Sequence, residues 1–148
     1  LAAAVLALAA IDVAALNGLR EARAERDRFT AIAQDISQAG RWWYMAGQDG
    51  FVGSGGTLIA PRRDAPPFVL FHDLRALEGD DRYTLWLVSA EGRWSRAASF
   101  RPDGRSLQAV ELPRWSMNGY ERCAVTIEPL ADGPRRGAVI MESRIAPP

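Results

Sequence analysis

Two segments in the second half of the chain, residues 83–88 and 124–130, are dense in β-branched and aromatic residues. Such residues favour β-strands. Pro129 and Pro134 remove backbone donors where the second segment ends, so a strand ladder cannot continue through them. Both segments therefore belong to one packed β-domain, and we expect Trp86 and Val125 to anchor its core.

Short strand-like segments, separated by turn residues, fill the chain beyond Gly40. We predict strands at 41–46, 50–53, 57–60, 68–72, 82–89, 94–100, 106–112, 120–128 and 137–142. Glu91-Gly92 is typical of a hairpin turn between two of them. The pattern predicts a mainly β fold, an antiparallel β-sandwich or barrel-like domain, preceded by one N-terminal α-helix.

The chain before Gly40 has two parts of different composition. Residues 1–16 are apolar except for Asp12, and they are too few to cross a membrane alone, which takes about 20 residues. We interpret them as the outer end of a transmembrane segment that begins upstream, or as the start of an apolar helix.

Residues 17–38 are rich in charged helix-forming residues, and we expect Ala39-Gly40 to end this helix. A narrow apolar stripe runs along it, made by Leu19, Ala22, Phe29, Ala33 and Ile36. The stripe has two readings: a juxtamembrane helical stalk that pairs with its copy in a homodimer, or a helix folded back onto the β-domain.

The strand motifs carry a family resemblance. Tyr-x-Leu-Trp-Leu-Val at 83–88, Phe-x-Pro-Asp-Gly at 100–104, Ala-Val-Thr-Ile-Glu-Pro at 124–129 and Gly133-Pro134 occur in the order found in anti-sigma-K factors. Over roughly 39–143 the chain resembles the C-terminal domain of that family, which makes 39–148 an anti-sigma-K-like β-domain. One loop departs from the family pattern, with Leu130-Ala131-Asp132-Gly133 in place of Gly-Gly-Ser.

The resemblance implies an extracytoplasmic regulatory domain of a single-pass, membrane-bound anti-sigma factor. In such proteins a cytoplasmic segment, absent from this chain, holds an extracytoplasmic-function sigma factor until a signal releases it. The implied partners are that sigma factor, the membrane through the N-terminal apolar segment, and regulatory proteases that cut near the membrane. No enzymatic activity is implied.

Composition excludes several functions. The 18 basic and 18 acidic residues cancel, which argues against nucleic-acid binding. Every basic residue is Arg, so lysine chemistry is excluded. With one His and one Cys, His72 and Cys123, the chain offers neither a metal-ligand cluster nor a cysteine pair. Cys123 lies in an apolar strand register and is expected to be a small buried hydrophobe.

The remaining polar residues give no catalytic, cofactor or metal site. His72 and Asp73 are adjacent on a strand, so we expect them to face opposite sides and not to cooperate. The glycine-rich 53–57 segment reads as a mobile turn, the acidic Glu78, Asp80 and Asp81 as a solvated loop, and Glu128 as a hydrogen-bond acceptor for a turn.

Two other functional classes stay open. The alternative to the regulatory domain is a secreted or surface-anchored β-sandwich binding module, in which Trp42, Trp43 or Trp115 contacts a glycan, peptide or protein. It requires an exposed aromatic patch, although most of the five tryptophans are expected in the core or at its rim. A hydrolase would require a polar cleft around His72 with a nearby Ser.

Overall fold

The computed structural model describes residues 39–61, 65–129 and 132–145. Within them the chain forms strands β1 (Ala39–Gly47), β2 (Gly55–Pro61), β3 (Phe68–His72), β4 (Arg82–Ser89), β5 (Trp94–Phe100), β6 (Leu107–Glu111), β7 (Tyr120–Glu128) and β8 (Val139–Arg144). A single 3-10 turn, η1 (Asp49–Phe51), lies between β1 and β2. The mainly β prediction is confirmed.

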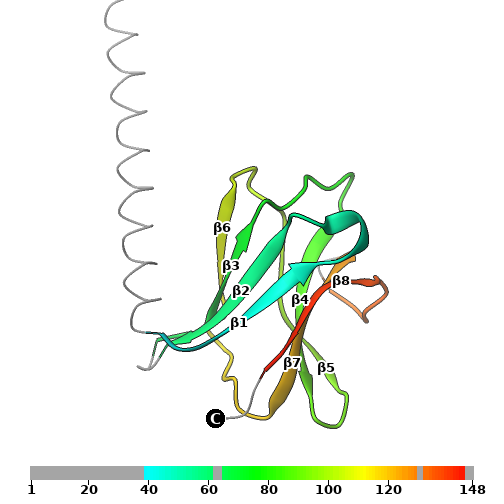
Figure 1. The fold of residues 1–148 in the computed structure, drawn as a ribbon. Helices are drawn as coiled ribbons and strands as arrows, with labels where there is room; N and C mark the ends of the chain where they lie inside the picture. The colour runs from blue at the N-terminus through cyan, green and yellow to red at the C-terminus, as the bar shows by residue number, and fades with distance from the viewer. Residues whose placement is uncertain (1–38, 62–64, 130–131, 146–148) are drawn as a thin grey trace, which may run out of the picture. The chain divides into compact units, whose positions relative to one another are not determined.

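All strand pairs are antiparallel, and they join into one eight-stranded sheet with the order β5-β4-β7-β8-β1-β2-β3-β6. The sheet curls into a nearly closed barrel, which is the barrel-like alternative and not a sandwich of two sheets (Figure 1). The apolar segment 1–16 and the helix predicted at 17–38 lie outside the described residues. The part of the chain that is described holds no helix long and apolar enough to span a membrane.

Alternation along the strands fills the barrel. On β4, Tyr83, Leu85 and Leu87 point inward and are fully buried. On β7 the inward residues are Cys123 and Val125, also fully buried. Because side chains on a strand alternate between its two faces, the same register sends the intervening residues to the outer wall. The prediction that Val125 anchors the core is confirmed.

The two edge strands, β5 and β6, are drawn together by the segment that connects them. Phe100 of β5 packs on Phe71 of β3 across the interior, with ring centroids 5.1 Å apart. In the connection, the Gln108 side chain accepts a hydrogen bond from Asp103 N and donates one to the Arg101 carbonyl. These contacts hold the two ends of the curled sheet near each other.

The outer wall over β4 and β7 is buried too. Trp86 is 3% exposed, yet it lies outside the core cluster, because it points away from the barrel interior. The prediction that Trp86 is a buried anchor of the domain is confirmed, and its packing is on the outer side of the wall. Its neighbours are stacked arginine and tryptophan side chains, which with Trp86 we call the arginine–tryptophan layer: Trp86, Trp94, Arg96, Arg122 and Arg135.

One predicted strand is wrong. Residues 50–53 are not a strand: η1 ends at Phe51, and Gly53 follows in a turn with φ of 97°. Glycine tolerates that conformation without steric cost, so the chain reverses here. Ala39 and Gly40 belong to β1, and the helix that was predicted to end at them lies outside the described residues.

Candidate functional site

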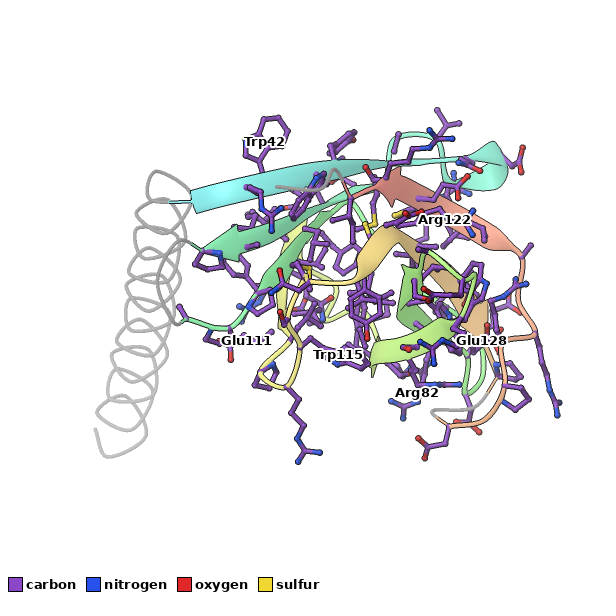
Figure 2. The ribbon with its side chains drawn as sticks, turned by 90° about the horizontal axis from the view of Figure 1, so that it is seen from below. Trp42, Arg82, Glu111, Trp115, Arg122 and Glu128 are labelled. Carbon is purple, nitrogen blue, oxygen red and sulfur yellow. The ribbon has the colours of Figure 1, made fainter. Side chains whose placement is uncertain are left out.

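Strand β1 carries an exposed aromatic surface. Its inward residues Trp43 and Met45 are buried, whereas Trp42 is 63% and Tyr44 is 47% exposed. Figure 2 shows Trp42 pointing away from the barrel wall. Large exposed aromatic side chains at alternate positions of one strand are typical of a contact surface. Of the three tryptophans considered for binding, Trp42 is exposed, Trp115 is partly buried and Trp43 is buried.

A polar chain of side chains continues this surface onto β3. The Tyr44 hydroxyl lies 3.1 Å from His72 Nε2, and His72 Nδ1 lies 3.2 Å from Asp73 Oδ2. A carboxylate can only accept, so Nδ1–H donates to Asp73, which leaves Nε2 of a neutral imidazole to accept from Tyr44. The Tyr44 and His72 rings are nearly parallel, at 4°.

The expectation that His72 and Asp73 do not cooperate is wrong. Asp73 follows the end of β3 and adopts a left-handed conformation with φ of 50°, so strand alternation does not apply to it. The turn swings its carboxylate back toward the imidazole. Asp73 N also donates to the Ser106 carbonyl, which fixes this corner to the neighbouring chain.

Gly55 makes room for the Tyr44–His72 contact. A Cβ at this position would lie 2.5 Å from both His72 Nε2 and the Tyr44 hydroxyl. Gly55 and Gly56 are part of β2, so the reading of 53–57 as a mobile turn is wrong for most of the segment. The glycine therefore serves a close approach between side chains of β1 and β3.

Ser54 lies beside this cluster without being aligned for catalysis. Its hydroxyl donates to the Asp73 main-chain carbonyl at 2.6 Å, and the residue is 4% exposed. A nucleophilic serine instead needs its proton directed to the base. The arrangement therefore supplies a fixed corner of the fold and does not form the Ser–His pair that a hydrolase requires.

Glu128, at the end of β7, organises the connection to β8. Its carboxylate accepts from Arg136 N and Gly137 N, and it accepts from the Thr126 hydroxyl at 2.6 Å. Thr126 in turn accepts from Trp86 Nε1 at 2.8 Å. The prediction that Glu128 hydrogen-bonds a turn is confirmed, and the turn is the one that closes the outer wall beside the arginine–tryptophan layer.

The electrostatics of Glu128 follow from these bonds. Burial alone would raise the pKa of this carboxyl, but the bonds from Thr126 and from the two backbone amides, with the nearby Arg96 charge, outweigh it. Its pKa is therefore held below the ordinary glutamate value. Hydrogen bonds to the charged form are the physical cause.

Cys123 is inert. It lies fully buried in the core, and burial raises the pKa of its thiol to about 12. A thiolate is the reactive form, so this thiol is not nucleophilic at neutral pH. The prediction of a small buried hydrophobe is confirmed.

The acidic loop before β4 shows no ligand geometry. Asp81 N donates to the Glu78 carbonyl, which closes a turn. Among the residues described, no group of three or more His, Cys, Asp or Glu side chains is placed to hold a metal ion.

These observations define a small antiparallel β-barrel domain with a buried outer layer on one side and an exposed aromatic strand on the other. The family model described as anti-sigma-K factor rskA, C-terminal, matches residues 1–138. The chain therefore belongs to that family, as the strand motifs indicated, and the family supports a regulatory anti-sigma role with a sigma factor as partner. No curated protein and no solved structure matches the chain.

Sequence reasoning named Trp42 but missed the rest of the β1 surface. The spacing of Trp42 and Tyr44 could have predicted this surface, because residues two apart in a strand share a face. Tyr44 meets His72 because β2 pairs with both β1 and β3. Neither the composition nor the hydrophobic periodicity of the sequence predicts this strand order. The contact of Tyr44 with His72 was therefore found in the structure alone.

Proposed function

We propose that this chain is the extracytoplasmic regulatory domain of a membrane-bound anti-sigma factor that controls an extracytoplasmic-function sigma factor. The observation that carries the proposal is the family match across residues 1–138. The apolar residues 1–16 support the membrane part of it, since they have the composition of one end of a membrane span. The domain sits in a single-pass protein, on the side opposite the sigma factor.

The domain acts without catalysis of its own. Two of its buried polar residues hold the fold: Glu128 binds backbone amides, and Ser54 binds a main-chain carbonyl. Regulation is then indirect. A signal, or a protease cut near the membrane, changes access to the span and releases the sigma factor that a segment outside this chain holds.

A topology assay tests this proposal. Alkaline phosphatase and green fluorescent protein are fused in turn after residue 148 of the protein encoded by the complete gene. We expect active phosphatase and dark fluorescent protein, because phosphatase folds only outside the cytoplasm and the fluorescent protein only inside it. Fluorescence with inactive phosphatase would refute the extracytoplasmic location.

A second assay addresses the sigma factor. We expect the complete protein to retain its sigma factor in a pull-down and the 148-residue chain alone to retain none. Binding by the isolated chain would place the sigma contact in this domain. It would overturn the proposal that a segment outside this chain holds the sigma factor.

The 17–38 segment is proposed to be a stalk that pairs with its copy. Its apolar stripe supports the pairing. Light scattering of residues 1–148 and of 39–148 measures the mass in solution. We expect a dimer for the longer chain and a monomer for the shorter one, and a monomer in both cases would contradict the stalk.

The exposed aromatic strand favours a second candidate function, a secreted or surface-anchored binding module. Trp42 and Tyr44 support it, because their exposure is unusual for such large side chains. The complete gene separates the two functions. A cleavable signal peptide with no sigma-binding segment supports the module, and a cytoplasmic segment with a complete span supports the anti-sigma factor.

A further inference from the structure

The outer faces of β1 and β3 together carry a flat aromatic surface. The rings of Tyr44 and His72 are parallel within 4°, their centroids are 6.0 Å apart, and the Tyr44 hydroxyl meets His72 Nε2 at 3.1 Å. At this separation the rings are displaced sideways and meet near their edges. A Cβ on Gly55 would lie 2.5 Å from both contacting atoms, so the pair rests on the backbone of β2. We call the two rings the Tyr44–His72 plate.

The plate is fixed in place by a chain of hydrogen bonds. His72 Nδ1 donates to the Asp73 carboxylate at 3.2 Å. The backbone of Asp73 is held on both sides, because its N–H donates to the Ser106 carbonyl and its carbonyl accepts from the Ser54 hydroxyl. Side chains that are ordered before binding lose little conformational entropy when a ligand arrives. The plate is therefore preorganised for contact.

The rings are open to solvent. Tyr44 is 47% exposed, and the side chain of His72 is 34% exposed. Trp42 precedes Tyr44 by two residues on the same face of β1, which is about 7 Å along the strand. Its ring is 63% exposed and points away from the barrel wall (Figure 2). A ligand that lies along β1 can therefore contact the plate and Trp42 together.

The exposed aromatic area is small for a protein partner. A Trp or Tyr side chain contributes about 150–250 Å², so the exposed fractions of Trp42 and Tyr44 amount to roughly 150–300 Å². Ile59 and Phe68 follow Trp42 across β2 and β3, but they are 1% and 7% exposed and add little. A standard interface takes about 800 Å² from each partner. The area suits a ligand that presents one or two small rings.

The polar groups around the plate suit hydroxyl groups. The Asp73 side chain is 64% exposed, and its bond with His72 engages Oδ2, so Oδ1 can accept from a ligand. Thr57 pairs with Tyr44 in the β1–β2 register and lies on the same face. A pyranose ring has C–H groups that stack on an aromatic face and a rim of hydroxyls that donate and accept. The plate and its rim match these two parts of a sugar.

Charge selects among sugars. The outward positions of β1, β2 and β3 within the described residues hold no Asp, Glu or Arg. The Asp73 carboxylate adjoins the plate and repels uronic acids and phosphates. We propose that the Tyr44–His72 plate and Trp42 bind pyranose rings of a neutral glycan. The proposal rests on the second candidate function, the binding module, and names its ligand.

The surface binds sugar without cleaving it. Glycoside hydrolysis ordinarily takes two carboxyl groups that flank one bond. The described outward positions of β1, β2 and β3 supply none, and the Asp73 carboxylate is one group, already joined to His72. The bound glycan is therefore a ligand and not a substrate.

A titration with defined sugars tests the proposal. Nuclear magnetic resonance follows the whole 148-residue chain with neutral hexasaccharides of glucose, mannose, xylose, galactose and N-acetylglucosamine, and with hexagalacturonate as the acidic probe. We expect at least one neutral sugar to shift the Trp42 indole and the rings of Tyr44 and His72 saturably at millimolar concentrations, and hexagalacturonate to shift none. No shift of these rings, or equal binding of hexagalacturonate, would overturn the proposal.

A library of linear peptides panned on the same chain separates the ligand from the binding function. Peptides that shift the Trp42 indole where no sugar does would overturn the glycan and leave the binding module standing. If neither sugars nor peptides bind, both the glycan and the module fail. The topology assay above is unaffected in every case, because none of these measurements depends on where the domain lies in the cell.

Two substitutions of Tyr44 separate ring stacking from hydrogen bonding. Tyr44→Leu removes the ring, whereas Tyr44→Phe keeps it and loses only the hydroxyl. We expect Tyr44→Leu to weaken binding of the neutral sugar at least about tenfold and Tyr44→Phe less than about threefold. Val52→Ala, at an exposed apolar residue in the β1–β2 connection, is the control and should change nothing. Circular dichroism establishes that each variant is folded, and equal losses for the two Tyr44 variants would overturn stacking on the plate.

The selection against acidic sugars has its own variant. Asp73→Asn removes the charge, keeps a side-chain oxygen for His72 and tolerates the left-handed backbone. We expect hexagalacturonate to gain measurable binding, and the neutral sugar to bind less than about fivefold more weakly. Asp80→Asn, at an exposed carboxylate in the β3–β4 connection, is the matched control and should change neither. Continued exclusion of hexagalacturonate by Asp73→Asn would overturn the role given to this charge.

Discussion

Two tryptophans point outward from different sides of the barrel, on strands separated by β7 and β8, and their surroundings are opposite. Trp86 on β4 is 3% exposed, and Trp42 on β1 is 63% exposed. Trp86 donates to Thr126, has the Arg96 guanidinium 4.8 Å from its ring centroid, and meets Trp94 edge-on. The structure describes no comparable layer over Trp42. Figure 2 shows this ring standing clear of the strand.

The difference follows from the long connection between β7 and β8, which packs on the part of the wall that holds Trp86 and Trp94. Glu128 ties this connection down through Arg136 N and Gly137 N, and Arg135 reaches back to the ring of Trp94. One half of the wall is thereby closed and stabilises the fold. The half at β1 keeps the rings of Trp42 and Tyr44 exposed.

The comparison predicts its largest effect for the two tryptophans themselves. Trp86→Ala should lower the free energy of unfolding by about 3–5 kcal/mol, because it empties a filled site and leaves Thr126 without a donor. Trp42→Ala should change it by less than about 0.5 kcal/mol, since the ring is mostly in water. Urea unfolding of residues 39–148 measures both. Similar losses would mean that Trp86 and Trp42 contribute equally to stability, and that the contrast in their burial has no energetic consequence.

Glu128 should have the next largest effect. Glu128→Ala removes the buried carboxylate that accepts from Thr126 and from the partly buried amides of Arg136 and Gly137, at a cost of about 2–3 kcal/mol. Glu111→Ala is the matched control, because Glu111 is exposed on β6, and it should cost less than about 0.5 kcal/mol. The urea unfolding midpoints of the two variants measure the two losses. A loss for Glu128→Ala no larger than that for Glu111→Ala would contradict the role of Glu128 in holding the β7–β8 connection.

Acid should reduce the difference in free energy of unfolding between the wild type and Glu128→Gln. The folded pKa of Glu128 is lowered, so its stabilising contribution is complete above the unfolded value of 4.5 and is lost as pH falls through the folded pKa. Unfolding curves between pH 7 and pH 2 follow this difference. A difference that is constant with pH would show that the charge of Glu128 is not what holds the connection.

The smallest effect is expected at the exposed half. Gly55→Ala pushes a methyl group between Tyr44 and His72, and we expect a loss of about 1 kcal/mol, since both side chains are partly exposed and can move away. Gly50→Ala, where a Cβ meets nothing within 4 Å, is the control. Nuclear magnetic resonance shifts of the His72 ring report the displaced contact, and unchanged shifts would rule out the close approach.

Sequence reasoning recovered the strands but not their faces. The run at 83–88 is apolar and aromatic throughout, which predicts a strand buried on both sides without saying what covers each. Trp86 was accordingly assigned to the core, although it faces the outer layer. Residues 51–52 have strand-forming side chains, but the flanking glycines let the chain turn instead.

The parts that could not be predicted depend on distant segments. Among the described residues, β1 pairs with β8, almost 100 residues later, only at Ala46 and Gly47. The contact of His72 with Asp73 depends on a left-handed backbone at a residue that is not glycine. Glu128 was predictable as a turn acceptor because Pro129 ends its strand, whereas its partners lie across a connection whose path the sequence does not encode.

The buried thiol of Cys123 has a practical consequence for spectroscopy. With the pKa of its thiol at about 12 and no exposed sulfur, the native chain behaves toward maleimide reagents as if it had no cysteine. A single new cysteine at an exposed position, such as Val52, can then carry a fluorescent or spin label while Cys123 keeps its place in the core.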